Sequence, residues 1–163
     1  MSSHYETKQP LSRELIDRIV KSRYVNVGLY YLRQVFFGKY DIRVHTDKES
    51  TDHTALWNDL RASITKLHYG PRAPGQGSFN HIASGYDAGY YGYLYSLVFA
   101  SDMYATVFKQ DPLDPARGAK YRAAILRPGG SRDDDESLKE FLGRPPNSEA
   151  FVRELFGSTS SNL

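Results

Sequence analysis

The chain contains no cysteine among its 163 residues. Disulfide bonds, thiolate metal ligands and a cysteine nucleophile are therefore excluded. The chain also lacks an excess of charge of one sign, because 21 basic and 19 acidic residues leave a formal net charge of +2. Binding to nucleic acid needs a clustered basic face, so this balance predicts no nucleic-acid partner.

The sequence has no hydrophobic run long enough to cross a membrane. Its main apolar stretch, Leu94–Ala100, is soon followed by Asp102 and Lys109, whereas a membrane-spanning helix needs about 20 apolar residues. The N-terminus is charged and has no apolar core, unlike a secretory signal. We therefore expect no membrane association and an intracellular, cytoplasmic protein.

Apolar residues recur at three- and four-residue spacings, and stretches rich in glycine and proline separate the periodic segments. This pattern predicts an all-α fold of about six or seven helices joined by Gly/Pro-rich loops. The first expected helix follows a cap at Ser12. The next three are expected from Val25 or Asn26 to about Val44, from Ala55 (capped by Asp52 or Thr54) to His68, and from Tyr86 or Asp87 to Phe108. The last three are expected from Pro115 to Leu126, from a cap at Ser131 or Asp133 to Leu142, and from a cap at Ser148 to Phe156.

Tyrosine and glycine are plentiful in one stretch, Phe79–Phe108. Between residues 85 and 95, tyrosines occupy positions 86, 90, 91, 93 and 95, and glycines occupy positions 85, 89 and 92. Each glycine costs a helix interior roughly 1 kcal/mol relative to alanine, and buried phenol hydroxyls need hydrogen-bond partners. A helix that served packing alone would avoid this composition, so the stretch is a candidate functional site.

The spacing of these residues predicts two faces of one helix. At 100° per residue, Tyr86, Tyr90 and Tyr93 share a face. Phenols donate hydrogen bonds without carrying charge, which suits a peptide carbonyl or an oxyanion that develops from it. A packing helix with polar-tipped aromatic residues is the alternative, because aromatic stripes at helical spacing usually belong to a core. A neighbouring stripe of small residues would let another backbone approach closely: Gly85, Gly89, Gly92 and Ser96.

The run from His81 to Tyr93, HIASGYDAGYYGY, resembles the tyrosine-rich signature of the thimet oligopeptidase, neurolysin and saccharolysin family of zinc metallo-oligopeptidases. The resemblance covers nearly the whole chain. Segments 22–26, 32–34 and 36–38 are similar to the long helix of the family, and segments 121–122, 125–131 and 141–144 are similar to its C-terminal end.

The resemblance implies roles for individual residues. Tyr86 and Tyr93 correspond to the tyrosines that bind substrate and stabilise the tetrahedral oxyanion. His81 and Tyr90 correspond to other residues that line the substrate channel. The loop Gly70–Ser78 corresponds to a mobile, glycine-rich loop that covers the bound peptide. The substrate-binding positions expected beside the two catalytic tyrosines are His81, Tyr90, Gly85, Gly75 and Gly77.

One element of the family is missing from this sequence. The catalytic zinc of the family is held by the two histidines of a His-Glu-x-x-His motif and a downstream glutamate, and the glutamate of the motif is the general base. The resemblance therefore implies zinc in the complete enzyme, bound upstream, and no metal on this chain's own residues. No two of the five histidines lie four residues apart: His4, His45, His53, His68 and His81.

We therefore expect residues 1–157 to be the C-terminal portion of a metallopeptidase catalytic domain, and residues 158–163 to be a disordered tail. The leading hypothesis is part of a zinc metallo-endopeptidase that hydrolyses short peptides and is inactive alone. Its expected partners are short peptides and the upstream zinc-bearing segment of the same enzyme. The alternative is a non-catalytic peptide-binding or interaction module that keeps the tyrosine groove. Without the zinc-bearing helix, an apolar face should lie uncovered.

Overall fold

The computed structural model describes residues 3–48, 52–67 and 70–157. These residues form seven α-helices and one isolated antiparallel bridge between Ser3 and Pro10, with no β-strand. The all-α prediction is therefore confirmed. The predicted tail 158–163 and the predicted end of the third helix at His68 lie outside the described residues.

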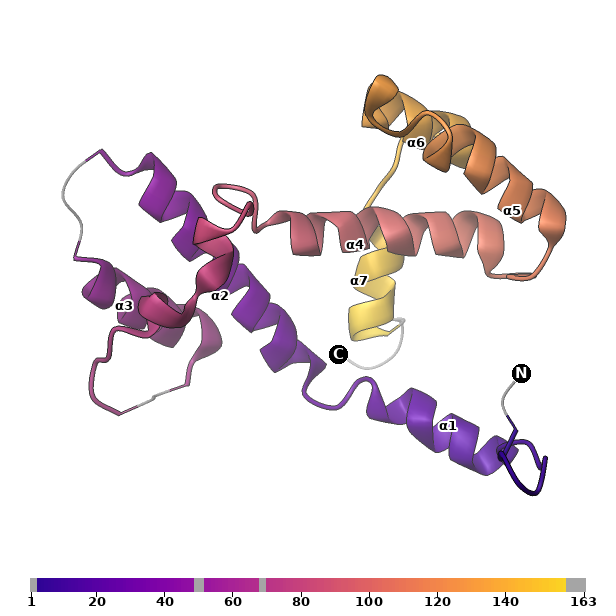
Figure 1. The fold of residues 1–163 in the computed structure, drawn as a ribbon, viewed down its shortest axis with the longest axis horizontal. Helices are drawn as coiled ribbons and strands as arrows, with labels where there is room; N and C mark the ends of the chain where they lie inside the picture. The colour runs from indigo at the N-terminus through magenta and orange to yellow at the C-terminus, as the bar shows by residue number, and fades with distance from the viewer. Residues whose placement is uncertain (1–2, 49–51, 68–69, 158–163) are drawn as a thin grey trace, which may run out of the picture.

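The helices follow one another along the chain (Figure 1). They are α1 (Arg13–Ser22), α2 (Val27–Thr46), α3 (His53–Thr65), α4 (Gly92–Met103), α5 (Pro115–Tyr121), α6 (Asp134–Leu142) and α7 (Glu149–Phe156). The π-helical turns Tyr104–Phe108 and Arg122–Leu126 continue α4 and α5. Helical structure therefore extends to Phe108 and Leu126, as predicted.

Side-chain caps fix the starts of several helices. The hydroxyl of Ser12 accepts the N–H of Leu15 at 3.3 Å, and the carboxylate of Asp52 accepts the N–H of Ala55 at 2.9 Å. Such caps satisfy backbone donors that have no partner inside the helix. Asp133 caps α6 in the same way. The cap predicted for α7 is wrong in one detail, because the side chain of Ser148 makes no capping bond, whereas Asn147 Oδ1 accepts the N–H of Glu149 at 3.0 Å.

The prediction that the central helix starts at Tyr86 or Asp87 is wrong. This helix, α4, begins at Gly92. Gly85 and Ala88 have positive φ angles of +90° and +54°, which are incompatible with a right-handed helix. The stripe of small residues predicted from Gly85 to Ser96 therefore does not run along one helix.

Two separate clusters of buried side chains hold the fold together. The first lies between α2, α3 and the segment that precedes α4, and it contains Phe36, Tyr40, Trp57, Phe79 and Tyr90. The second joins the end of α5 to α6, and it contains Ala124, Phe141 and Leu142. In Figure 1, α2 and α3 lie on one side of the molecule, and α5 and α6 lie on the other, with α4 running between them.

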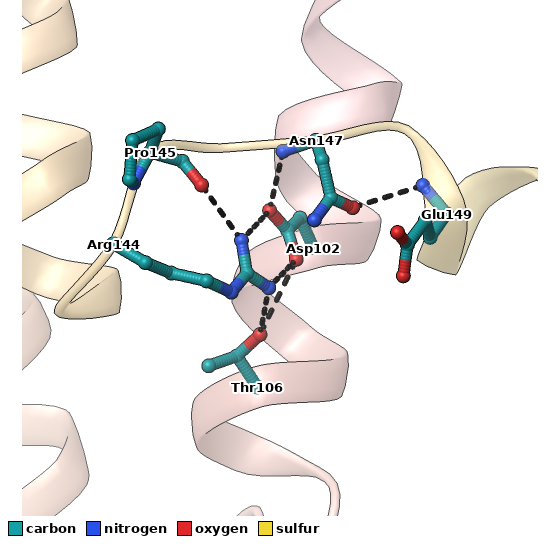
Figure 2. A network of polar contacts seen from close by, with 6 residues as sticks. All are labelled: Asp102, Thr106, Arg144, Pro145, Asn147 and Glu149. Carbon is teal, nitrogen blue, oxygen red and sulfur yellow. Dashed lines mark hydrogen bonds and ion pairs between the residues drawn. The ribbon is translucent and has the colours of Figure 1, made fainter.

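A polar network ties the chain before α7 to α4 (Figure 2). The buried carboxylate of Asp102 accepts hydrogen bonds from both terminal nitrogens of Arg144 and from the backbone N–H of Asn147 at 2.9 Å. Thr106 bonds to the same two side chains. The hydrogen bonds from Arg144 lower the pKa of Asp102 against the opposing effect of burial. The carboxylate of Asp102 therefore stays ionised and balances the positive charge of Arg144.

The molecule exposes an unusually large surface. Its accessible area is 12186 Å², whereas a compact protein of its mass would expose roughly 8,200 Å². Helix α1 has no buried residue, and its apolar residues Leu15, Ile16, Ile19 and Val20 face solvent. The expected uncovered apolar surface is therefore present. Within the described ranges, no helix combines the length and the hydrophobicity needed to span a bilayer.

Candidate functional site

Three tyrosines and one histidine gather beside the N-terminus of α4. We call them the tyrosine cluster: His81, Tyr86, Tyr90 and Tyr93. The rings of Tyr86 and Tyr93 stack with their centroids 5.1 Å apart, and those of Tyr90 and Tyr93 lie 4.9 Å apart. The ring of His81 lies 5.5, 5.4 and 6.1 Å from the rings of Tyr86, Tyr90 and Tyr93. The three tyrosines are thus brought together as predicted, although a turn rather than a helix does so.

Asp41 of α2 holds the turn that carries Tyr86 and Tyr90. Its carboxylate is fully buried and accepts the backbone N–H groups of Ala88 and Tyr90, each at 3.0 Å. His45 Nδ1 lies 3.0 Å from the same carboxylate. The two backbone donors have no helical acceptor in this turn, so the carboxylate replaces the missing helical hydrogen bonds.

The three phenols of the cluster differ in their exposure to solvent. Tyr90 is only 5% exposed, and its hydroxyl donates a hydrogen bond to Gln34 Oε1 at 2.8 Å. Burial is the main cause that raises the pKa of Tyr90. Tyr86 and Tyr93 are 41% and 40% exposed. These two hydroxyls are therefore the ones within reach of a substrate, whereas substrate contact by Tyr90 stays a prediction.

The environment of Tyr93 favours its neutral form. A hydrogen bond with Tyr86 is the largest cause, and together with desolvation and the nearby phenols it raises the pKa of Tyr93 to about 12. Tyr93 therefore keeps its proton at neutral and moderately alkaline pH. A neutral hydroxyl can meet a peptide carbonyl without the large desolvation cost of an ionised group.

We expect Tyr93 to ionise well above the ordinary tyrosine pKa of 10.0, and we expect Tyr86→Phe to lower its pKa. Because the pKa is raised in the folded state, the protonated phenol contributes stability that is complete below pH 10 and lost as the pH rises through about 12. NMR of the tyrosine ring carbons during an alkaline titration measures this pKa. Tyr104→Phe is the control, because that exposed tyrosine lies outside the cluster. An unchanged Tyr93 titration in Tyr86→Phe would contradict the proposed cause.

The loop that precedes the cluster is anchored to α3. Asn58 Nδ2 donates to the carbonyl of Ala73 at 3.0 Å, and Gln76 Nε2 donates to the hydroxyl of Thr54 at 2.9 Å. Residues Gly75–Ser78 form a 3₁₀ turn. That the loop covers a bound peptide stays a prediction.

The glycines predicted to bind substrate have different structural surroundings. A Cβ atom added to Gly75 would lie 2.9 Å from Cε2 of Trp57 and still closer to Nε1, so the indole requires a glycine there. Gly85 has a positive φ, which residues with a Cβ atom rarely adopt. Gly77 has open space around it, and nothing in the structure explains its identity. Substrate contact stays a prediction for all three.

The described residues do not fit a zinc ion. Across residues 3–48, 52–67 and 70–157, no group of three or more histidine, aspartate or glutamate side chains is placed to hold a metal. His81 is surrounded by aromatic rings rather than carboxylates.

The sequence reasoning missed three residues that build the site: Gln34, Asp41 and His45. A signal for Asp41 was present, because it follows Tyr40 within the largely apolar run of α2. An acidic residue on an inward-facing helix position usually has buried hydrogen-bond donors to satisfy. His45 follows Asp41 by four residues, which places both on one face of the helix.

The chain is similar to known peptidases over almost its whole length. Residues 1–156 match the sequence profile described as Peptidase family M3. Saccharolysin of Saccharomyces cerevisiae is 45% identical over 159 residues, which cover 95% of this chain and 22% of saccharolysin. Oligopeptidase A of Escherichia coli is 33% identical over 157 residues, which cover 93% of this chain and 23% of that protein. The human mitochondrial intermediate peptidase is 31% identical over 160 residues, covering 93% and 21% respectively. The chain thus spans less than a quarter of the length of these relatives.

Proposed function

The chain belongs to peptidase family M3, and on that premise we propose that it forms the substrate-binding and oxyanion-stabilising part of a zinc metallo-endopeptidase that hydrolyses short peptides. The observation that carries this proposal is the stacked pair of half-exposed phenols, Tyr86 and Tyr93. Their hydroxyls would donate hydrogen bonds to the scissile carbonyl oxygen as it gains negative charge. Neutral donors that are fixed before the reaction stabilise such a charge without reorganising.

The fixed position of the pair supports this role. Tyr93 lies in the first turn of α4, and Tyr86 lies in the turn that the buried carboxylate of Asp41 holds. Tyr90 packs beneath Tyr93, and its own hydroxyl is bound to Gln34. The two exposed hydroxyls are therefore presented by a rigid base, which is a requirement for oxyanion stabilisation.

We propose that the zinc and the general base belong to the remainder of the enzyme. Two observations support this division. The chain covers 22% of saccharolysin, and its accessible surface of 12186 Å² is far larger than that of a compact protein of its mass. The apolar face of α1 and the exposed Leu29 and Leu32 of α2 would be covered by that remainder. Residues 1–157 would then be the C-terminal portion of the catalytic domain.

If the zinc and the general base lie in the remainder of the enzyme, the chain alone and the chain in a complete enzyme should give opposite results. We expect the pure chain to cleave no quenched fluorescent peptide, with or without added zinc. We expect cleavage by a chimera in which this chain replaces the aligned 159 residues of saccharolysin. Because the two sequences are 45% identical over that segment, the replacement should fold. Initial rates of fluorescence release, with and without a chelator, measure both activities.

Unmodified saccharolysin is the positive control for the chimera. Chelator-sensitive cleavage by the pure chain would overturn the proposed division. A folded chimera that binds zinc but hydrolyses nothing would overturn the proposed catalytic role. If the chimera were inactive while the pure chain bound peptides, the two results together would favour a non-catalytic peptide-binding module.

A further inference from the structure

A second feature lies beside the tyrosine cluster. A cavity of about 510 Å³ opens between α2, α3 and the segment that leads to His81. Aromatic rings form much of its wall, including those of Phe37 and Trp57, and polar side chains line the rest, including Arg33, Arg61 and His81. Its size and mixed lining are typical of a small-molecule or peptide subsite.

The charged side chains in the described part of the cavity lining are arginines. The described lining includes two arginines and no aspartate or glutamate. The guanidinium of Arg33 lies 5.0 Å from the centroid of the Phe37 ring, which orients it by a cation–π contact. A planar guanidinium donates paired hydrogen bonds that match the two oxygens of a carboxylate. The lining therefore favours an anionic ligand of this shape.

A buried donor at the cavity wall has no partner. Trp57 is 6% exposed, and no described atom accepts a hydrogen bond from its indole Nε1. Buried polar groups in folded proteins are nearly always paired, so an orphan donor needs an explanation. Gly75, which packs against this nitrogen, lines the same cavity. The backbone of Gly75 closes this nitrogen off from solvent, so the unpaired donor belongs to the cavity wall and is not itself a contact for a ligand.

The cavity adjoins the tyrosine cluster at His81. His81 lines the cavity, and its ring also lies 5.5 Å from that of Tyr86 and 5.4 Å from that of Tyr90. Arg33 precedes Gln34, which accepts the hydroxyl hydrogen bond of Tyr90. A peptide that reached Tyr86 and Tyr93 could therefore extend past His81 into the cavity.

We propose that this cavity is a carboxylate-binding subsite, in which Arg33 and Arg61 bind a carboxylate of the peptide held at the tyrosine cluster. The inference rests on the proposed peptide-binding function of the cluster. A carboxylate can come from a free C-terminus or from an acidic side chain, and both carry the same two oxygens. In either case, the subsite selects peptides by a negative charge at a fixed distance from the two tyrosines.

The chain carries its own reporter for this subsite. Trp57 is its only tryptophan and lines the cavity, so intrinsic tryptophan emission reports occupancy. Three probes are titrated into the pure chain: acetyl-Gly-Gly-Ala as the free acid, the same peptide as the C-terminal amide, and acetyl-Gly-Gly-Glu amide. We expect at least one of the two carboxylate probes to bind roughly tenfold or more tightly than the uncharged amide, as charge-assisted hydrogen bonds predict.

Arg33→Gln should remove most of this preference. Arg33 is exposed on α2, so the substitution should preserve the fold, and far-ultraviolet circular dichroism checks this. Arg43→Gln is the control, because it removes the same group from another exposed position of α2 that does not line the cavity. A preference for the free acid alone identifies a terminal carboxylate, and a preference for the glutamyl amide alone identifies an acidic side chain.

Equal affinity for all three probes, or no saturable change of emission with any of them, would overturn the subsite. So would an equal loss of preference in Arg33→Gln and Arg43→Gln. The outcome is separable from that of the proposed function. An inactive chimera with an intact Arg33-dependent preference leaves the subsite standing, whereas an active chimera without any preference leaves the catalytic proposal standing.

Discussion

Tyr93→Phe in the saccharolysin chimera is expected to lower kcat by about 10²- to 10³-fold, with little change in KM. The substitution removes one hydroxyl and preserves the ring that stacks on Tyr86 at 5.1 Å. A hydrogen bond that strengthens only as the carbonyl becomes an oxyanion stabilises the transition state and not the bound substrate. The loss should therefore fall on kcat. Steady-state kinetics with the quenched fluorescent peptide measure both parameters.

Tyr95→Phe is the matched control for this substitution. Tyr95 lies on the same helix, is 58% exposed, and contacts the rings of Tyr91 and Phe99 rather than the tyrosine cluster. We expect its kcat to stay within about twofold of the parent chimera. An equal fall in kcat for both variants, or a change confined to KM for Tyr93→Phe, would contradict the oxyanion role of Tyr93.

The sequence predicts the helices well because their signals are local. Ser12, Asp52 and Asp133 each accept an N–H group within the first turn of the helix that they start. These bonds join residues two or three positions apart, so a short sequence window contains both partners. The start of α4 could not be predicted in this way. The group that decides it, the carboxylate of Asp41, lies 47 residues before its partner Ala88 in the sequence.

The tyrosine cluster could likewise be predicted only in part from local sequence patterns. The grouping of Tyr86, Tyr90 and Tyr93 was predicted from helical spacing, yet Tyr86 reaches Tyr93 through a turn. Positive φ angles at Gly85 and Ala88 make that turn possible, and sequence spacing does not report them. The chemistry of phenols suggested donors for a peptide carbonyl or oxyanion, whereas the roles of individual tyrosines came from the family resemblance. The buried partners that position them depend on tertiary contacts, which local patterns do not encode.

Asp41→Asn in the pure chain is expected to lower the free energy of unfolding by roughly 2–3 kcal/mol. The substitution leaves one buried N–H donor without an acceptor, and the other N–H donor loses its charged partner. Asparagine has nearly the same size as aspartate, but only one of its two terminal atoms accepts hydrogen bonds. The carboxylate accepts the N–H groups of Ala88 and Tyr90 with its two different oxygens. One of these two bonds must therefore be lost. Urea unfolding followed by circular dichroism measures the change.

Asp102→Asn separates this local effect from general destabilisation. Asp102 is the other deeply buried aspartate of the described chain, and it also accepts a backbone N–H group, that of Asn147. We expect a comparable loss of stability from it, because Arg144 loses its charged partner. Hydrogen exchange then distinguishes the two variants. Asp41→Asn should expose the amides of Ala88 and Tyr90 to faster exchange, whereas Asp102→Asn should leave both protected, since its contacts lie at the opposite end of α4. Wild-type protection of both amides in Asp41→Asn would show that Asp41 does not position the tyrosine cluster.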